Sequence, residues 1–436
     1  SYLGRLSYNY KQRYFIEGSF RTDGSSRFES DVRWGNFFSV GASWVISDES
    51  FLSSSDAINL LKLRGSYGEL GNNQVLDAFG NPKYFPYLSL FETGENELEN
   101  TGVVLGAVAD PFLTWEKTAS SNIGLDFGLF NNIITGSVDY YSKESVDLIY
   151  DKPLAISTGN SSITTNVGSV KNYGIEVSLN ANIIRKENLR WTSSVNFSID
   201  KNEVTELTQE SFINGTKRWE VGRSLFEFYT FEWAGVDPAT GYALWYKDVL
   251  DSNGDPTGER VTTNEYANAS RNYLGKSSLP DIIGGFNNSL TVGNFDLNVL
   301  FNFSLGSYIY DSSYAALFGS FETSGNAASA DLVNRWQKPG DMTNIPLLLA
   351  SQNDFSSQSD RFIFKNDYLR LKALTIGYNL PTKTVNRIGM SKLRLYLQGD
   401  NLATFQSHKG IDPEQSYAGT TNYRSYNKKI FSFGVN

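Results

Sequence analysis

The chain has 436 residues, a formal net charge of −9, 14% aromatic residues and no cysteine. The acidic balance argues against a nucleic-acid partner, because phosphate binding requires a concentrated basic face, and the absence of cysteine excludes disulfides, thiol catalysis and Cys-ligated zinc. The longest uninterrupted apolar run, Ile345 to Ala350, is far shorter than the roughly 20 apolar residues of a membrane-spanning helix. Because no linker divides the chain, we expect one large all-β domain over residues 1–436.

Alternation with period two is the strongest pattern, and it recurs in segments of about ten residues, the length that a tilted strand needs to cross a bilayer. The clearest segments are Asn122–Leu129, Trp191–Asp200, Phe295–Leu305 and Leu393–Gln398, and in the third only Leu300 breaks the pattern. Alternation by itself also fits a soluble sandwich or barrel. In a transmembrane barrel, one face of these strands meets lipid and the other forms a polar inner wall. We expect that wall to include Asn196, Asp296, Asn298, Asn302 and Arg394.

The connections between these strands alternate strictly between short and long. Short ones are expected at residues 11–13, 47–59, 131–132, 182–188, 293–294 and 381–391. Long ones are expected at about 21–35, 69–117, 143–167, 201–283, 306–361 and 402–427. Asn131-Asn132 and Gly293-Asn294 are predicted to be two-residue hairpin turns, since Asn and Gly tolerate positive φ. Short periplasmic turns and long external loops are typical of an outer-membrane barrel.

This pattern predicts about 13 strands, an odd number, whereas single-chain bacterial barrels have an even number. We therefore expect at least one strand upstream of residue 1, which would make the chain a C-terminal part of a larger barrel. Aromatic residues gather near the predicted strand ends, where rings with a polar atom would form two girdles at the membrane–water interfaces. Cross-strand aromatic packing is the alternative explanation. The residues are Tyr8, Tyr10, Tyr14, Phe15, Phe37, Phe38, Tyr140 and Tyr141.

Several stretches, in order along the whole chain, resemble the SusC/RagA-type TonB-dependent outer-membrane transporters of Bacteroidetes. The longest is RNYLGKSSLPDIIGGFNNSLTVGNFDLNVLFNFSLGSYIYD (271–311). The others are FRTDGSSRF (20–28), LLKLRGSYGELGNNQ (60–74), LTWEKTASSNIGLDFGLF (113–130), GSVKNYGIEVSLN (168–180), YLRLKALTIGYNLP (368–381) and LRLYLQGDNLATF (393–405).

The resemblance implies a 22-stranded barrel with a plug, of which about the last 13 strands are in this chain. It also implies a bacterial outer-membrane location, import of oligosaccharides or peptides, a SusD-like lipoprotein as lid, and TonB acting through an N-terminal region. Nothing in residues 1–436 corresponds to the plug, the N-terminal extension or the TonB-contacting segment. The end FSFGVN lacks the terminal aromatic residue of such barrels, so we expect that a few residues follow it.

Patterns that carry chemistry are weak. The single histidine, His408, has no nucleophile motif nearby, and Gly275-Lys276-Ser277 lacks the first glycine of a phosphate-binding loop because residue 270 is Ser, so neither an enzyme nor a cofactor is expected. Asp251, Asn253 and Asp255 have the one-three-five spacing of a calcium loop, but Pro256 and Thr262 replace its Gly and Glu. This weak metal candidate stands beside a plain turn in an external loop.

Four tryptophans lie in the two longest connections, where aromatic faces would stack on sugar rings or pack on peptide side chains. They are Trp219, Trp233, Trp245 and Trp336. The alternative is that they form small hydrophobic cores within folded loops or the contact with the lid protein.

The sequence therefore predicts an all-β, transmembrane antiparallel β-barrel that imports large nutrients without chemistry. A passive porin would share the barrel but lack an upstream plug. A surface β-rich adhesin would bury the apolar face of residues 295–305 in a protein core and remain soluble without detergent.

Overall fold

The structure, a computed structural model, describes residues 1–77, 80–97, 100–319, 325–349, 354–414, 417–421 and 425–436. It contains two compact units: residues 1–186, 190–211 and 220–224 in the first, and 187–189, 212–219 and 225–436 in the second. A large antiparallel sheet counts thirteen strands, eight from the first unit and five from the second, which confirms the expected strand number. Within the described residues, no helix is both long enough and apolar enough to span a membrane.

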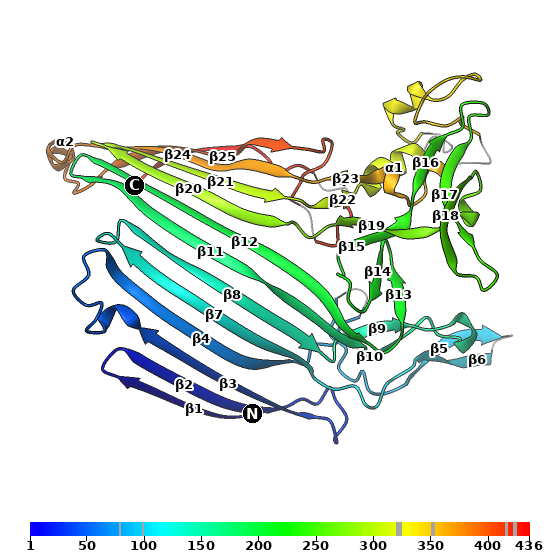
Figure 1. Cartoon of the computed structure of the whole chain (residues 1–436), viewed down its shortest axis with the longest axis horizontal. Helices are drawn as coiled ribbons and strands as arrows, with labels where there is room; N and C mark the ends of the chain where they lie inside the picture. The colour runs from blue at the N-terminus through cyan, green and yellow to red at the C-terminus, as the bar shows by residue number, and fades with distance from the viewer. Residues whose placement is uncertain (78–79, 98–99, 320–324, 350–353, 415–416, 422–424) are drawn as a thin grey trace. The chain divides into compact units, whose positions relative to one another are not determined.

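The long strands of the first unit lie side by side in chain order, from blue to green in Figure 1. They are β1 (Tyr2–Tyr10), β2 (Tyr14–Gly24), β3 (Trp34–Val45), β4 (Ile58–Asn72), β7 (Glu116–Leu129), β8 (Ile134–Val146), β11 (Gly168–Lys186) and β12 (Leu189–Leu207). Its long connections form two hairpins, β5 (Leu90–Glu97) with β6 (Asn100–Ala107) and β9 (Ile149–Pro153) with β10 (Ser162–Asn166). Two 3-10 turns complete the unit, η1 (Ile46–Asp48) and η2 (Ile156–Thr158).

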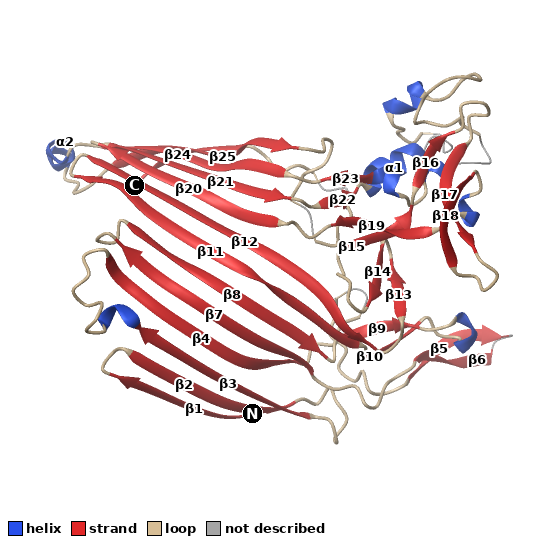
Figure 2. Ribbon diagram, viewed as in Figure 1, coloured by secondary structure: helices blue, strands red, loops and turns tan. Residues whose placement is uncertain are grey.

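The long strands of the second unit are β20 (Ile282–Val292), β21 (Phe295–Leu305), β24 (Tyr368–Asn379), β25 (Arg394–Gln406) and β26 (Ile430–Val435). Its long connections are folded, as Figure 2 shows by its colours. One loop sheet contains β13 (Ser211–Asn214), β14 (Lys217–Glu220), β15 (Glu227–Phe231) and β19 (Arg271–Ser277), and another contains β16 (Trp233–Val236), β17 (Ala243–Leu250) and β18 (Pro256–Thr263). The remaining pieces are β22 (Tyr308–Tyr310), β23 (Ile363–Lys365), α1 (Ser312–Gly319), α2 (Thr382–Val385), η3 (Tyr266–Asn268), η5 (Ala330–Asn334), η6 (Asp354–Ser356), η7 (Asp360–Phe362) and η8 (Asn386–Ile388).

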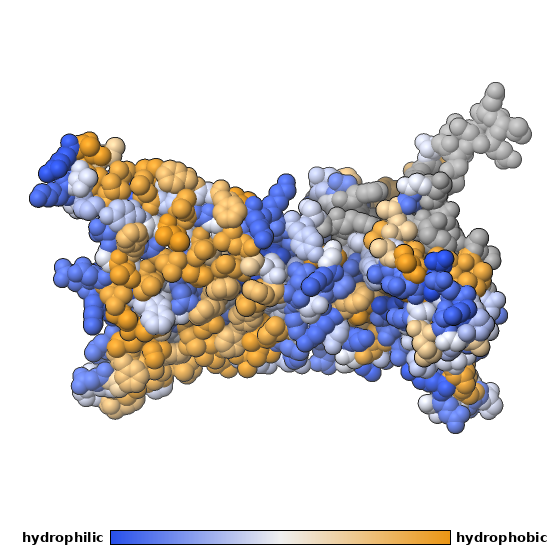
Figure 3. Space-filling view, turned by 90° about the horizontal axis from the view of Figure 1, so that it is seen from above, coloured by the Kyte–Doolittle hydropathy of each residue, from blue (hydrophilic) through white to orange (hydrophobic). Residues whose placement is uncertain are grey.

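Register separates an apolar face from a polar face in the second unit. One row of directly opposed residues is Leu290, Leu297, Ile376, Leu397 and Phe433, and the next is Ser289, Asn298, Thr375, Gln398 and Ser432. Side chains in adjacent rows point to opposite faces. In the apolar row, Ile376, Leu397 and Phe433 are 49%, 61% and 67% exposed, and Figure 3 shows apolar side chains gathered over the long strands. Such a surface is stable in contact with lipid rather than with water.

A bulge on β24 lies opposite Leu300, where the alternation of β21 breaks. On β24, Ala373 pairs with Leu300 and Leu371 pairs with Phe301, so Lys372 has no partner residue on β21. One extra residue on a strand re-aims its neighbours. Arg370, opposite Asn302, is thereby kept on the polar face.

The short turns confirm positive φ at Gly293, Asn131 and Asn132 but not at Asn294, and they correct two turn lengths. Gly293 has a φ of 57°, and Val292 and Phe295 pair across a two-residue turn. Asn131 and Asn132 also have positive φ, but Phe130 does too, and β7 and β8 are joined by residues 130–133 rather than by two residues. The joint between β11 and β12 is residues 187–188, shorter than the expected 182–188, because each strand has 19 residues.

Aromatic side chains lie at both ends of the apolar face in the first unit. Tyr14 stacks on Trp44 with ring centroids 6.3 Å apart, and Tyr2 stacks on Trp34 at 6.4 Å. The ten residue-to-residue steps from Trp34 to Trp44 on β3 correspond to roughly 33 Å along the strand. At a tilt of about 40° this distance spans about 25 Å, the height of the apolar band of an outer-membrane barrel.

Consecutive aromatic residues divide between the two faces, which corrects the expectation that both members of a pair join a girdle. Phe38 is exposed beside Tyr67, whereas Phe37 is buried against Trp115. Tyr140 is likewise exposed, whereas the hydroxyl of Tyr141 bonds to Asp200. The period of two along a strand makes this division unavoidable.

Candidate functional site

The polar face of the second unit carries an ion pair between two residues that the sequence assigned to the inner wall. Arg394 Nη2 lies 2.5 Å from Asp296 Oδ2, and Asn379 Nδ2 donates to Asp296 Oδ1 at 3.2 Å. Gly377 lies beneath the pair, and a Cβ there would be 2.5 Å from both Arg394 Nη2 and Asp296 Oδ1. Only glycine leaves room for this arrangement.

The first unit has a similar arrangement around Arg64 on β4. The guanidinium Nε donates to Asp126 Oδ1 at 3.1 Å, and Nη2 donates to Asp139 Oδ2 at 2.6 Å. A Cβ on Gly124 would lie 2.3 Å from Asp139 Oδ1. In both units the wall is polar, and its charges are largely paired with each other.

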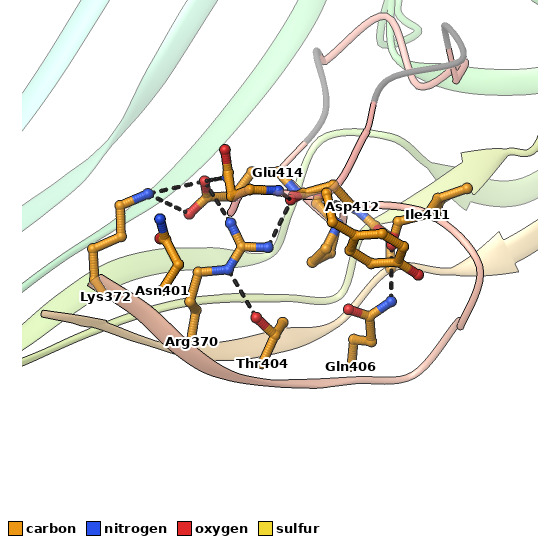
Figure 4. A network of polar contacts seen from close by, with 12 residues as sticks. Arg370, Lys372, Asn401, Thr404, Gln406, Ile411, Asp412 and Glu414 are labelled. Carbon is orange, nitrogen blue, oxygen red and sulfur yellow. Dashed lines mark hydrogen bonds and ion pairs between the residues drawn. The ribbon is translucent and has the colours of Figure 1, made fainter. Parts of the chain in front are cut away.

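A polar cluster of the second unit joins the strand wall to the last long loop (Figure 4). Arg370 on β24 is 1% exposed, and its Nη2 and Nη1 lie 2.9 Å from Asp412 and 2.8 Å from Glu414. Lys372, displaced by the bulge, reaches the same Glu414 at 3.0 Å. Thr404 on β25 accepts a hydrogen bond from Arg370 Nε at 3.0 Å. We call these five residues the Arg370 cluster.

The carboxylates of the Arg370 cluster also organise the loop main chain. Asp412 accepts the backbone N–H groups of Asn427 at 2.7 Å and Glu414 at 2.9 Å. Burial acts to raise the pKa of Asp412, but these N–H donors and Arg370 outweigh it, so the pKa lies below the usual value. The loop is thereby held on the polar face by a charge rather than by an apolar core.

His408 lies at the start of the same loop and forms a second contact of this loop, with Asp311. Its Nε2 is 2.9 Å from Asp311 Oδ2, and its ring stacks on Phe364 at 4.0 Å. Asp311 also accepts the backbone N–H of Tyr314 at 2.9 Å and the hydroxyl of Thr421 at 3.3 Å. Burial opposes ionisation of Asp311, but the hydrogen bond with His408 and the other donors lower its pKa overall. The histidine thus has a structural contact with a buried carboxylate.

Sequence reasoning did not identify the Arg370 cluster. A partial signal exists, because Arg370 and Lys372 lie two residues apart among leucines and so share the polar phase of a strand. Asp412 and Glu414 show the same spacing inside a predicted loop, where charged residues are usually solvated. The pairing of the two sets required the fold.

The four loop tryptophans lie in or against folded loop cores. Trp245 is 2% exposed and Trp336 is buried. Trp233 packs edge-on against Trp245 at 5.6 Å and donates its indole N–H to Asn344 at 2.6 Å. Trp219 packs on Phe212 at 4.8 Å. Their role toward cargo or lid stays a prediction.

Two buried basic side chains, those of Arg361 and Lys217, pack in these loops without a carboxylate at ion-pair distance among the described residues. Arg361 lies 4.5 Å over Trp233 and 4.8 Å over Phe318 and donates to Asn344 O at 2.8 Å, while burial lowers its pKa to about 10. Lys217 lies 3.1 Å over Phe228 and donates to Phe226 O at 2.6 Å, and burial lowers its pKa to about 6. Both side chains belong to folded loops of the second unit.

The weak calcium candidate forms a turn. Asp251 Oδ1 accepts the backbone N–H groups of Asn253 at 2.8 Å and Asp255 at 3.0 Å, and these bonds lower the pKa of Asp251. Among the described residues, no group of three or more His, Cys, Asp or Glu side chains is arranged to hold a metal ion. Calcium binding by Asp251, Asn253 and Asp255 stays a prediction.

An antiparallel sheet with one lipid-type face, one face of paired charges, short turns and folded long loops defines the wall of an outer-membrane β-barrel. The family model described as "TonB dependent receptor-like, beta-barrel" matches residues 1–402. The chain belongs to this family, whose members are transporter receptors of the bacterial outer membrane, as the sequence predicted.

Individual relatives agree with this assignment. The chain is 32% identical to TonB-dependent receptor P3 of Formosa agariphila over 100% of its own length and 45% of that protein. It is 30% identical to TonB-dependent receptor SusC of Bacteroides thetaiotaomicron over 95% of its length and 41% of SusC. The structure of the RagAB peptide transporter matches with a TM-score of 0.85 and 28% identity, covering 99% of this chain and 47% of that one. The chain thus spans about half the length of the relatives it matches.

Proposed function

We propose that residues 1–436 are the C-terminal part of one transmembrane β-barrel domain in a TonB-dependent importer of large nutrients. The observation that carries the proposal is the two-faced sheet within a family of TonB-dependent receptors. A closed barrel satisfies its backbone hydrogen bonds internally, which is the condition for strands to exist in lipid. The polar face then lines the path of the cargo.

The cargo class is an oligosaccharide or a peptide, supported by similarity to SusC and to the RagAB peptide transporter. A SusD-like lipoprotein would cover the external loops, and TonB would act through a region outside residues 1–436. The four loop tryptophans would support the surfaces that meet cargo or lid. Since Trp245 is buried, it would act by shaping its loop rather than by direct contact.

Transport without bond chemistry is the mechanism we propose, so the chain is not an enzyme. His408 pairs with a buried carboxylate and stacks on Phe364, an arrangement that holds a loop in place. Because the charges of the wall are paired with each other, the electrostatic field along the polar face is small. A neutral cargo would therefore pass along this face without being held at one charge.

Uptake in cells tests this function. The gene for the full-length transporter is deleted and restored, and uptake of fluorescent oligosaccharide and peptide mixtures is measured with TonB present and absent. We expect uptake of one mixture to require both the transporter and TonB. Uptake that requires the transporter but continues without TonB would identify a passive porin instead, and no transporter-dependent uptake of either mixture would refute import.

A further inference from the structure

A cavity of about 170 Å³ lies in the second unit beside the ends of three long strands. Its polar or aromatic lining includes Ser278, Ser304, Tyr308, Tyr368, Glu414 and Tyr417. At about 30 Å³ per water molecule, the volume equals roughly six waters. This is room for one small ring or one side chain of a larger cargo.

Two hydroxyl side chains line this cavity without a hydrogen-bond partner among the described residues. Ser304 on β21 and Tyr368 on β24 are 6% and 8% exposed, and they are directly opposed in the sheet. Neither side chain donates or accepts a hydrogen bond within the part of the chain that the structure describes. By contrast, the Ser278 hydroxyl accepts from Lys217 Nζ at 3.1 Å and donates to Tyr417 O at 2.7 Å. Hydroxyls that open to a cavity without a protein partner are available to bond to a ligand or to water.

The charge around the cavity is balanced. Glu414 is the one ionisable carboxylate among its described lining residues, and Arg370 and Lys372 lie 2.8 Å and 3.0 Å from it. A cationic ligand would compete with these two cations, and an anionic ligand would be repelled by the carboxylate. The site therefore fits a neutral group.

We propose that this cavity is a subsite for one neutral, hydroxylated sugar ring of the cargo, an inference that rests on the import function proposed above. A hydroxyl can both donate and accept a hydrogen bond. Ser304 and Tyr368 can therefore bond to the hydroxyls of a sugar either as donors or as acceptors. The rings of Tyr308, Tyr368 and Tyr417 offer apolar faces to the C–H side of such a ring. A peptide bond would use one donor and one acceptor and leave these faces without a partner.

Binding to the purified full-length transporter tests the subsite. The neutral probes are methyl α-glucoside, methyl α-mannoside and methyl β-galactoside, compared with glucosamine, glucuronate and N-acetylalaninamide in saturation-transfer NMR titrations. We expect at least one methyl glycoside to bind best, and Ser304→Ala and Tyr368→Phe to weaken it about three- to tenfold each, the loss of one hydrogen bond. Ser289→Ala on β20 and Tyr378→Phe on β24 remove hydroxyls from the same strands outside the cavity and should leave the affinity unchanged.

Stronger binding of a charged sugar or of the amide would overturn the sugar subsite, as would no binding of any probe or equal losses in the control variants. Heat-dependent gel mobility of every variant verifies that its barrel is folded. The import function fails separately. If wild-type uptake lacks TonB dependence while the glycoside still binds, the transport proposal is wrong, whereas TonB-dependent uptake with no glycoside binding refutes only the subsite.

Discussion

Glycine at two positions of the sheet makes room for an ion pair rather than for a turn. Gly124 and Gly377 each lie under an arginine and a carboxylate from neighbouring strands. The missing side chain lets a charged pair lie flat on the wall, where both partners are desolvated together. Such a pair is costly to break, since one charge would then be left without its partner.

Substitution of these glycines should therefore destabilise the sheet. We expect Gly124→Ala and Gly377→Ala each to lower the free energy of unfolding by about 1–3 kcal/mol, because a Cβ would overlap the ion pair. Gly65→Ala is the control, since its Cβ would meet nothing closer than Asn122 O at 3.8 Å. Urea unfolding from lipid vesicles measures the difference, and equal values for Gly65 and Gly124 would contradict the steric argument.

The buried Lys217 predicts a pH dependence of loop stability. Its pKa is lowered from 10.5 to about 6 by burial, so between these values the unfolded state holds one more proton than the folded state. Stability attributable to this residue therefore increases with pH, by at most about 1.4 kcal/mol per pH unit, and is lost toward pH 6. Lys217→Met should remove that slope, and its stability advantage over wild type should shrink as pH rises from 7 to 9.5.

Thermal unfolding followed by hydrogen exchange in residues 212–277 measures this slope, and Lys247→Met, at an exposed position, is the control. Parallel pH profiles for wild type and Lys217→Met would show that the lysine is solvated in the folded state.

At the scale of elements, the strands and the loops are stabilised in different ways. A long strand is held by hydrogen bonds to its neighbouring strands and has one polar and one apolar face. Its apolar side chains need no protein partner because lipid covers them. The loops are stabilised by small cores such as that around Trp245 and Phe362, and by charges. The last long loop depends on the Arg370 cluster, which replaces a hydrophobic core with ion pairs.

Loss of the central cation should release that loop. Arg370→Met leaves Asp412 buried without its cation, a change that typically costs about 3–5 kcal/mol. We expect residues 407–414 and 425–429 to exchange amide hydrogens faster, while the strands β20 and β21 are unaffected. Lys372→Met should have a smaller effect, because its side chain is 34% exposed and, among the described carboxylates, contacts Glu414 alone. Equal protection in wild type and Arg370→Met would refute the role of the cluster.

The two faces of β21 predict opposite responses to a charge. Val299 belongs to the apolar face and Asn298 to the polar face. Val299→Arg should cost about 2–4 kcal/mol if its side chain meets the middle of the bilayer, whereas Asn298→Arg should be mild. Folding into lipid vesicles provides the measurement, and the assignment of faces fails if both variants lose the same stability.

At the scale of the whole molecule, lipid covers the apolar side chains of the long strands, as a protein core would in a water-soluble domain. The aromatic residues at the two ends of β3, Trp34 and Trp44, mark where that lipid should end. Their spacing matches the thickness of a bilayer, so the membrane boundaries follow from positions on the strands.

Fluorescence quenching tests these boundaries. In variants that keep one of the 8 tryptophans, we expect Trp34 and Trp44 to be quenched most by lipids brominated near the headgroup, and Trp245 to be quenched by none. The indole ring favours the interface, whereas a buried loop tryptophan meets no lipid. Stronger quenching of Trp44 by bromine at the ends of the lipid acyl chains would contradict the placement of Trp44 at the membrane–water interface.

The sequence by itself determined the strand number, the two faces and the alternation of short and long connections. These properties are local, because side-chain direction alternates along each strand whatever its neighbours are. The sequence thus placed Asp296 and Arg394 on the polar wall. It did not predict their contact, because they are 98 positions apart in the chain. The tertiary structure decided which charges meet, which loops fold over buried basic side chains, and that Ser304 and Tyr368 face one cavity. Each of these depends on contacts between segments that are distant in the chain.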